Sequence, residues 1–183
     1  MMGTANLIDV SWDQLGKRAE AFRTIIDLLP ANPVIVETGT VRELGNWLGD
    51  GQSTIVWDQV ATVLAGHVTT IDIDPIGAHL VDDLGLANTT AITGDSIVTL
   101  RKLSAATDLL YLDAFDIDFA APEPAQHHHL REIVAAWHLC RRGTIVAVDD
   151  NTPKAGKGKR VGEFVEQRGA VKIVDGYVQA WRI

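Results

Sequence analysis

Five short runs of apolar and β-branched residues divide the chain after residue 33. They lie at 34–37, 68–73, 89–93, 109–113 and 143–149. Runs of this kind are typical of strands buried on both faces of a parallel sheet, because a half-exposed strand would alternate between apolar and polar positions. The runs therefore predict a mostly parallel sheet.

Apolar residues at helical spacing fill the segments between these runs. The predicted helices cover about 12–29, 53–64, 124–140 and 161–168, with shorter helices after Asp74 and Gly94. Strands that alternate with helices imply right-handed crossovers in a parallel sheet. Two further strands, at 169–174 and 177–183, are separated by Asp175-Gly176, a dipeptide typical of hairpins.

We therefore expect an α/β, Rossmann-like fold. Its seven-stranded, mostly parallel sheet contains one antiparallel strand from the C-terminal hairpin, and helices cover both faces. The whole chain, 1–183, is expected to form a single domain, with a helical segment at 1–33 and the core at 34–183.

Composition and charge narrow the classes of function. The 183 residues carry a formal net charge of −8, which argues against nucleic acid because phosphate-backbone binding needs a basic face. No apolar stretch reaches the roughly 18 residues that span a bilayer, and the first residues lack the features of a secretory signal. The single cysteine, Cys140, excludes an internal disulfide. These features indicate a cytoplasmic protein that acts on a small molecule without a membrane partner, and they leave a homo-oligomer open.

Polar residues follow each of the first three strands, at the edge where α/β proteins bind ligands. Asp72 is placed where an acid can accept hydrogen bonds from ribose hydroxyls, and Asp95-Ser96 could contact an adenine edge. Gly39 stands alone, so the G-x-G-x-x-G dinucleotide fingerprint is absent. In the alternative interpretation Gly39 is only a turn residue, while Asp74 and Ser96 are helix N-caps.

Together these residues resemble the motifs of class I S-adenosylmethionine-dependent methyltransferases, over nearly all of 34–183. Glu37-Thr38-Gly39-Thr40 is similar to the first motif, Thr70 to Pro75 to the second, and Gly94-Asp95-Ser96 to the adenine-side turn. The stretch 41–50 departs from the compact loop of that family, and Gly51 to Thr54 resumes the motif. The resemblance implies S-adenosylmethionine as cofactor, with these candidate contacts: Glu37, Gly39, Thr40, Gly51, Ser53, Asp72, Asp95, Ser96 and Asp113.

The acids after the fourth and fifth strands resemble a metal site within the same family. Asp113 and Asp150-Asn151 are similar to the magnesium ligands of the catechol O-methyltransferase group, while macrolide-sugar O-methyltransferases favour the adjacent pair Asp149 and Asp150. A hard divalent cation prefers oxygen ligands. Bound to a substrate hydroxyl, it would lower the pKa of that hydroxyl and orient it for transfer. Alternatively, Asp113 and Asp150 are loop acids or contact the cofactor amine.

Three candidates remain for catalysis. Asp113 would act through the metal, Asp116 stands where the catechol group has a lysine base, and His128 lies in a histidine triplet at a helix start. A histidine titrates near neutrality and suits proton removal, although an exposed helix-start histidine is the simpler interpretation. The basic segment 154–160 lacks the spacing of a P-loop and is interpreted as a flap over the substrate or a solvated loop.

The leading hypothesis is an S-adenosylmethionine-dependent O-methyltransferase that acts on a small hydroxylated acceptor with the assistance of Mg²⁺. A metal-independent methyltransferase and a non-catalytic S-adenosylmethionine-binding or scaffold protein are alternatives. A nicotinamide-dependent oxidoreductase is disfavoured because the glycine fingerprint is absent.

Overall fold

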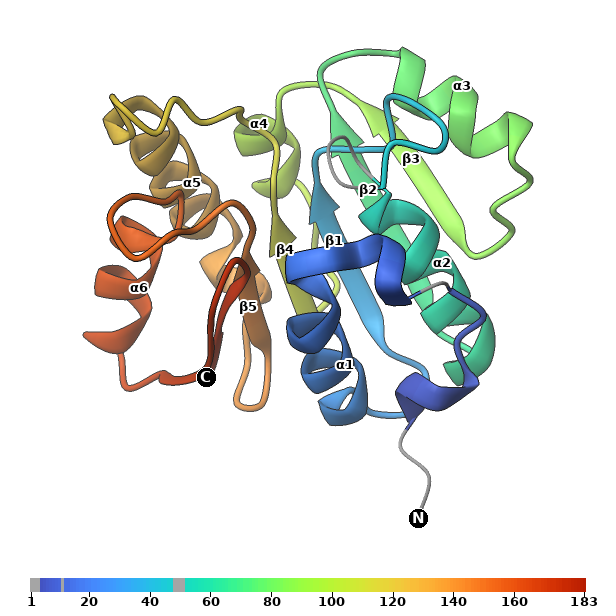
Figure 1. Cartoon of the computed structure of the whole chain (residues 1–183), viewed down its shortest axis with the longest axis horizontal. Coiled ribbons are helices and arrows are strands. Elements are labelled where there is room, and N and C mark those ends of the chain that lie inside the picture. Colours follow the sequence, from blue (N-terminus) through green and yellow to red (C-terminus); the bar gives the residue numbers. More distant parts are fainter. Residues whose placement is uncertain (1–3, 11, 48–51) are drawn as a thin grey trace.

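A seven-stranded sheet forms the centre of the molecule (Figure 1). The computed structural model describes residues 4–10, 12–47 and 52–183. Strand β7 pairs antiparallel with both of its neighbours, β5 and β6, and the other neighbouring pairs are parallel. The predicted fold class is therefore confirmed. In spatial order the strands are β3 (Thr89–Thr93), β2 (His67–Asp72), β1 (Val34–Thr38), β4 (Leu109–Leu112), β5 (Ile145–Val148), β7 (Gln179–Arg182) and β6 (Val171–Asp175).

Helices cover both faces of this sheet, and the central strands bury alternate side chains on opposite faces. Tyr111 packs in one hydrophobic cluster with Phe22 and Trp57, whereas its neighbours Leu110 and Leu112 pack in a second cluster. The first cluster includes residues of α1 (Ala19–Leu28) and α2 (Ser53–Leu64), and the second includes residues of α4 (Ser96–Leu100), α5 (Glu123–Ala136) and α6 (Lys159–Glu166). Helix α3 (Ile76–Asp83) contacts β3. Among the described residues, no helix combines the length and apolar composition needed to cross a membrane.

The prediction of one continuous helix over 12–29 is wrong. Trp12–Arg18 is a 3₁₀ segment, and α1 begins only at Ala19. Gly16 has φ 52° and ψ −120°, a conformation that glycine adopts readily and that ends a helical run. The break matters for the site because Arg18, at its end, is buried against Asp149.

Helix α5 also ends earlier than predicted. It stops at Ala136 and is followed by a 3₁₀ turn over Trp137–Leu139, instead of continuing to Cys140.

The register of the parallel strands brings their carboxyl ends to one level. Thr38 of β1 pairs with Ile71 of β2 and with Leu112 of β4, and Leu112 pairs with Val148 of β5. Residues that directly follow these strands therefore lie along the same edge of the sheet, where ligands bind in open α/β folds.

Candidate active site

Glu37, near the end of β1, is fully buried and is held by three hydroxyl groups. Ser53 Oγ donates to Oε1 at 2.6 Å, while Thr54 Oγ1 and Thr70 Oγ1 donate to Oε2 at 2.7 and 2.8 Å. Burial raises the pKa of Glu37 to about 7, against the opposite effect of the hydroxyl groups. We call these four residues the hydroxyl cluster. Ser53, predicted to contact the cofactor, is thus engaged with Glu37.

Gly39 and Thr40 form the turn that leads away from β1. Gly39 has φ +85°, and a Cβ there would lie 2.7 Å from the backbone oxygen of Asp113. Glycine is therefore required for the close approach of the loops after β1 and β4. The Thr40 N–H donates to Asp72 Oδ2 at 3.1 Å, so this turn also holds the acid at the end of β2.

The carboxylate of Asp72 is half-buried at the sheet edge. Besides Thr40, it accepts the backbone N–H of Asp74 on Oδ1 at 2.9 Å. Each carboxylate oxygen has a second lone pair, so Asp72 retains the capacity to accept hydrogen bonds from a ligand. The next residue, Ile73, is 76% exposed and adds apolar surface beside this polar position.

Asp95 and Ser96 lie beside this position, because the Gly94 N–H donates to the Asp72 carbonyl at 2.8 Å. Asp95 caps α4 by accepting the N–H of Val98 at 2.8 Å, so the predicted N-cap role belongs to Asp95 and not to Ser96. Ser96 is buried, with its Oγ 3.4 Å from Nε2 of His128. Gly51, the remaining predicted cofactor contact, lies outside the described residues.

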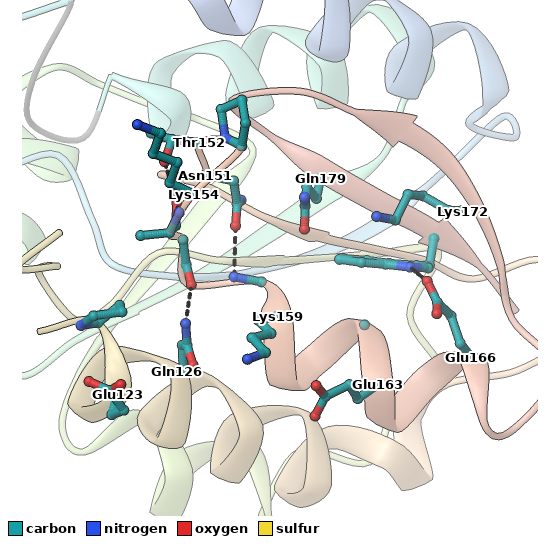
Figure 2. A pocket seen from close by; sticks show the side chains of 17 residues that line it. Glu123, Gln126, Asn151, Thr152, Lys154, Lys159, Glu163, Glu166, Lys172 and Gln179 are labelled. Atoms are coloured by element: carbon teal, nitrogen blue, oxygen red, sulfur yellow. Dashed lines mark hydrogen bonds between the residues drawn. The ribbon is translucent and has the colours of Figure 1, made fainter. Parts of the chain in front are cut away.

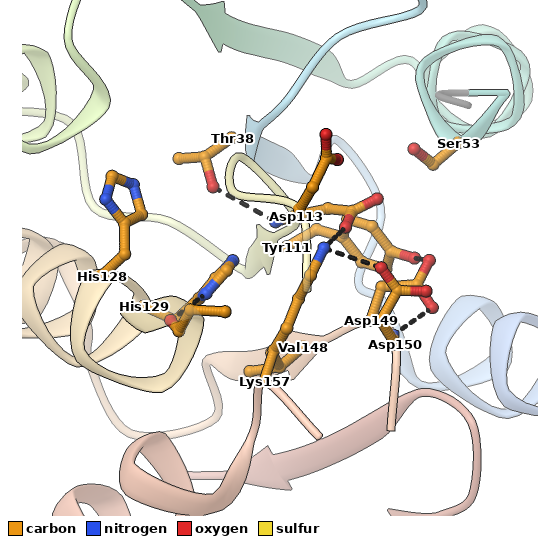
Figure 3. Close-up of polar contacts among 12 residues, drawn as sticks. Thr38, Ser53, Tyr111, Asp113, His128, His129, Val148, Asp149, Asp150 and Lys157 are labelled. Atoms are coloured by element: carbon orange, nitrogen blue, oxygen red, sulfur yellow. Dashed lines mark hydrogen bonds and ion pairs between the residues drawn. The ribbon is translucent and has the colours of Figure 1, made fainter. Parts of the chain in front are cut away.

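The acids after β4 and β5 surround a buried lysine (Figure 3). Lys157 Nζ lies 2.5 Å from Asp113 Oδ1 and 2.7 Å from Asp150 Oδ2, and its side chain is 1% exposed. Burial disfavours the ammonium, but the two carboxylates outweigh it and raise the pKa of Lys157 above its usual value. Lys157 is therefore a fixed positive charge at neutral pH.

Asp149 has partners of its own within the same group. Tyr111 Oη donates to Asp149 Oδ2 at 2.6 Å, and Arg18 Nη1 lies 3.5 Å from the same oxygen. Tyr177 Oη donates to Asp150 Oδ1 at 2.5 Å. We call Asp113, Asp149 and Asp150, with Lys157 and Arg18, the acid–cation cluster.

The predicted magnesium ligands do not fit a divalent ion as they are arranged. The three aspartates converge, but an ammonium already bridges Asp113 and Asp150. The Asn151 amide donates to the carbonyls of Val148 and Asp149 at 2.8 and 3.1 Å, and its oxygen accepts from Gly158 N at 2.8 Å. Within the described ranges, no group of three or more His, Cys, Asp or Glu residues could hold a metal ion.

His128 lies on α5 near the acids of the loop after β4. Its Nε2 is 3.3 Å from Oε1 of the fully buried Glu132, and its ring packs 5.0 Å from that of Phe115, just beyond Asp113. When Nε2 donates to Glu132, Nδ1 is left as the nitrogen that can accept a proton. Asp116, the other candidate base, is 81% exposed and pairs with Arg42 at 3.2 Å.

Two charged groups in this site were not anticipated from the sequence as site residues. The segment 154–160, interpreted as a flap or a solvated loop, places Lys157 in the interior, and Arg18 comes from the N-terminal segment. A sequence signal for Lys157 does exist, since it stands between Gly156 and Gly158 only a few residues after the two acids Asp149 and Asp150. Arg18 has no such signal, because its contact depends on the break at Gly16.

Comparisons with solved structures place this fold among methyltransferases. The chain is similar to the SAH-bound Podospora anserina methyltransferase PaMTH1 (TM-score 0.60, 16% identity, 93% of this chain and 80% of that one). It is also similar to MycE from the mycinamycin biosynthetic pathway in complex with Mg, SAH and mycinamycin VI (TM-score 0.63, 16% identity, 90% and 48%). A third similar structure is an rRNA methylase from Streptococcus thermophilus (TM-score 0.55, 14% identity, 91% and 95%).

At these identities the similarity establishes the Rossmann-like methyltransferase fold. The chain spans about half the length of several of the matched chains. No protein-family model matches the sequence, and no curated protein matches it either.

Proposed function

We propose that this protein is an S-adenosylmethionine-dependent methyltransferase that acts on a hydroxyl group of a small acceptor. The observation that carries the proposal is the position of Asp72 and Asp113 at one edge of a sheet with this topology, with His128 of α5 packed on Phe115 of the loop after β4. When bound, the cofactor supplies a methyl group on a sulfonium; the C–S bond breaks as the C–O bond forms, and the hydroxyl proton leaves.

The donor is assigned to the ends of β1, β2 and β3. Asp72 accepts hydrogen bonds from the ribose hydroxyls, since it is the half-buried acid with free lone pairs at this edge. Ile73, which follows Asp72 and is 76% exposed, and Val98, in the first turn of α4 and 47% exposed, offer apolar surface for the adenine ring. Glu37 and Ser53 support the turn from within, through their mutual hydrogen bond.

The acceptor is assigned to the ends of β4 and β5. A cavity of about 580 Å³ lies beside the loop after β5 and is lined by Asn151, Thr152 and Tyr177 among others. Its size suits a small molecule, and the net charge of −8 favours such an acceptor over nucleic acid. His128 takes the acceptor proton, and Glu132 acts as a positioning residue that holds the imidazole through Nε2.

Metal assistance is the part of the hypothesis that the geometry favours least. The complex of MycE includes Mg, and the aspartates of this chain would be the ligands of such an ion. Their charge is met instead by Lys157 and Arg18. We therefore propose that transfer proceeds without a divalent cation.

The direct test of the donor site is calorimetric titration with S-adenosylmethionine. Wild-type protein should bind it in preference to NAD, and Asp72→Ala should weaken binding at least about tenfold, equivalent to about 1.4 kcal/mol. Asp82→Ala, which removes an exposed aspartate from α3, is the matched control and should bind normally. Equal affinities for the two variants would reject the ribose assignment, and preference for NAD would favour an oxidoreductase.

Activity is tested separately, by transfer of labelled methyl groups to a panel of small hydroxylated acceptors and to rRNA. Transfer to a small acceptor supports the proposal. Transfer to rRNA alone would contradict the acceptor class, and tight binding of S-adenosylmethionine without any transfer would favour a non-catalytic binding protein.

A further inference from the structure

Lys157 occupies the centre of the acid–cation cluster with its charge fully engaged. The ammonium bridges the carboxylates that follow two different strands, Asp113 after β4 and Asp150 after β5 (Figure 3). Both aspartates are partly exposed, at 18% and 26%, while Lys157 is 1% exposed. The lysine therefore approaches the carboxylates from the protein side, and they present their remaining surface to the site.

Two hydrogen bonds fix the loop on either side of Lys157, and Figure 2 draws both of them. Gln126 Nε2 donates to the Gly156 carbonyl at 2.9 Å, and Asn151 Oδ1 accepts the Gly158 N–H at 2.8 Å. A Cβ at Gly156 would collide with Asn151, so only glycine permits this packing. The backbone of Gly156 and Gly158 lines a cavity of about 450 Å³ on one side of the loop, and the lysine side chain does not line it.

We infer that Lys157 is a covalently tethered substitute for a divalent cation in this active site. A cation that binds between Asp113 and Asp150 has to displace the ammonium of Lys157. This ammonium belongs to the same chain as the two carboxylates, so its effective concentration at the site is high. Like a metal ion, the ammonium draws carboxylates from neighbouring strands together and fixes their orientation. Unlike a metal ion, it offers no open coordination position to a substrate oxygen.

The inference has two parts, and each depends on different observations. The part that concerns cation binding is independent of methyl transfer, because it depends only on the contacts of Lys157. The part that concerns catalysis rests on the proposed function: Lys157 is a positioning residue, and turnover continues in excess chelator.

The test uses Mn²⁺ alone as the probe, with the free ion followed by electron paramagnetic resonance. In Lys157→Met the aspartates lose their ammonium and become available as oxygen ligands. This variant should bind one Mn²⁺ per chain at least about tenfold more tightly than wild type. Lys154→Met, which removes an exposed lysine from the same loop, should resemble wild type. Mn²⁺ should also raise the melting temperature of Lys157→Met and leave that of Lys154→Met unchanged.

Two results would overturn the inference. One is wild-type protein that binds Mn²⁺ as tightly as Lys157→Met. The other is wild-type binding of one Mn²⁺ that disappears in Asp150→Asn, which would show that the ion displaces the lysine. The second comparison uses only the wild-type lysine, so it decides the question even if Lys157→Met does not fold. A failure of methyl transfer would leave these binding results unchanged and would count against the proposed function alone.

Discussion

The two halves of the active-site edge neutralise buried acids in different ways. At the end of β1, the hydroxyl cluster surrounds Glu37 with uncharged donors from Ser53, Thr54 and Thr70. At the ends of β4 and β5, the acid–cation cluster meets its carboxylates with an ammonium and a guanidinium. Hydroxyl donors leave a buried carboxyl free to gain a proton, as the raised pKa of Glu37 indicates. In the acid–cation cluster, Lys157 outweighs the effect of burial and lowers the pKa of Asp150, whereas burial still raises the pKa of Asp113 to about 8.

Under the proposed function, this difference suits two different tasks. A donor that carries a sulfonium charge is better received where little fixed positive charge competes with it, and the described residues around Glu37 provide only neutral donors. An acceptor is positioned best by carboxylates that stay in place. The bridge made by Lys157 holds Asp113 and Asp150 in that way.

The largest expected effect comes from removing the cation of the second half. Lys157→Met leaves two half-buried carboxylates without their ammonium and should lower the free energy of unfolding by about 3 kcal/mol, measured by urea denaturation. Ser53→Ala removes one of three hydroxyl donors from Glu37 and should cost about 1.5 kcal/mol, because the other two donors remain. Equal losses in the two variants would contradict the distinction between the halves.

The second expected effect is on the pH dependence of stability, and it concerns the hydroxyl cluster alone. Burial raises the pKa of Glu37 from 4.5 to about 7 in the folded protein. The contribution of Glu37 to the free energy of unfolding is fully present below pH 4.5 and is lost as pH rises toward 7. The reason is that Glu37 ionises at a lower pH in the unfolded chain than in the folded protein. The loss amounts to about 3 kcal/mol for this shift.

Glu37→Gln should remove that component, so stability should decline less between pH 4.5 and 7 than in wild type. The measurement is chemical denaturation at a series of pH values. Glu163→Gln, at an exposed glutamate of α6, is the control and should keep the wild-type slope. If the Glu37→Gln slope also matches wild type, Glu37 is not the titrating group.

The sequence was sufficient for the architecture and for the strand ends, but not for the partners of the acids. Strand positions follow from local apolar runs, and parallel topology then places Asp72, Asp113 and Asp149 at one edge without further information. The contact of Lys157 with Asp113 joins residues 44 apart and depends on how a glycine-rich loop folds back. Local periodicity carries no information on such a contact.

The N-cap of α4 is a second feature that the sequence did not predict correctly. The alternative interpretation placed an N-cap at Ser96, one residue away from the observed cap at Asp95, because the exact start of α4 is not visible in the sequence. The pair Glu132 and His128, by contrast, is four residues apart on one helix. That spacing is visible in the sequence, because side chains at i and i+4 lie on the same helix face.

The last prediction concerns the residue that removes the proton from the acceptor hydroxyl. With any acceptor that gives turnover, His128→Ala should lower kcat at least about 100-fold, because the positioned imidazole is lost, while the affinity for S-adenosylmethionine should stay at its wild-type value. His127→Ala removes the exposed neighbour and serves as the control. Glu132→Gln should have a smaller effect on kcat and shift its pH profile, since the amide holds the ring without stabilising the imidazolium. Equal turnover in His128→Ala and His127→Ala would move the base to another group, and Asp116, exposed on the loop after β4, would be the next residue to replace.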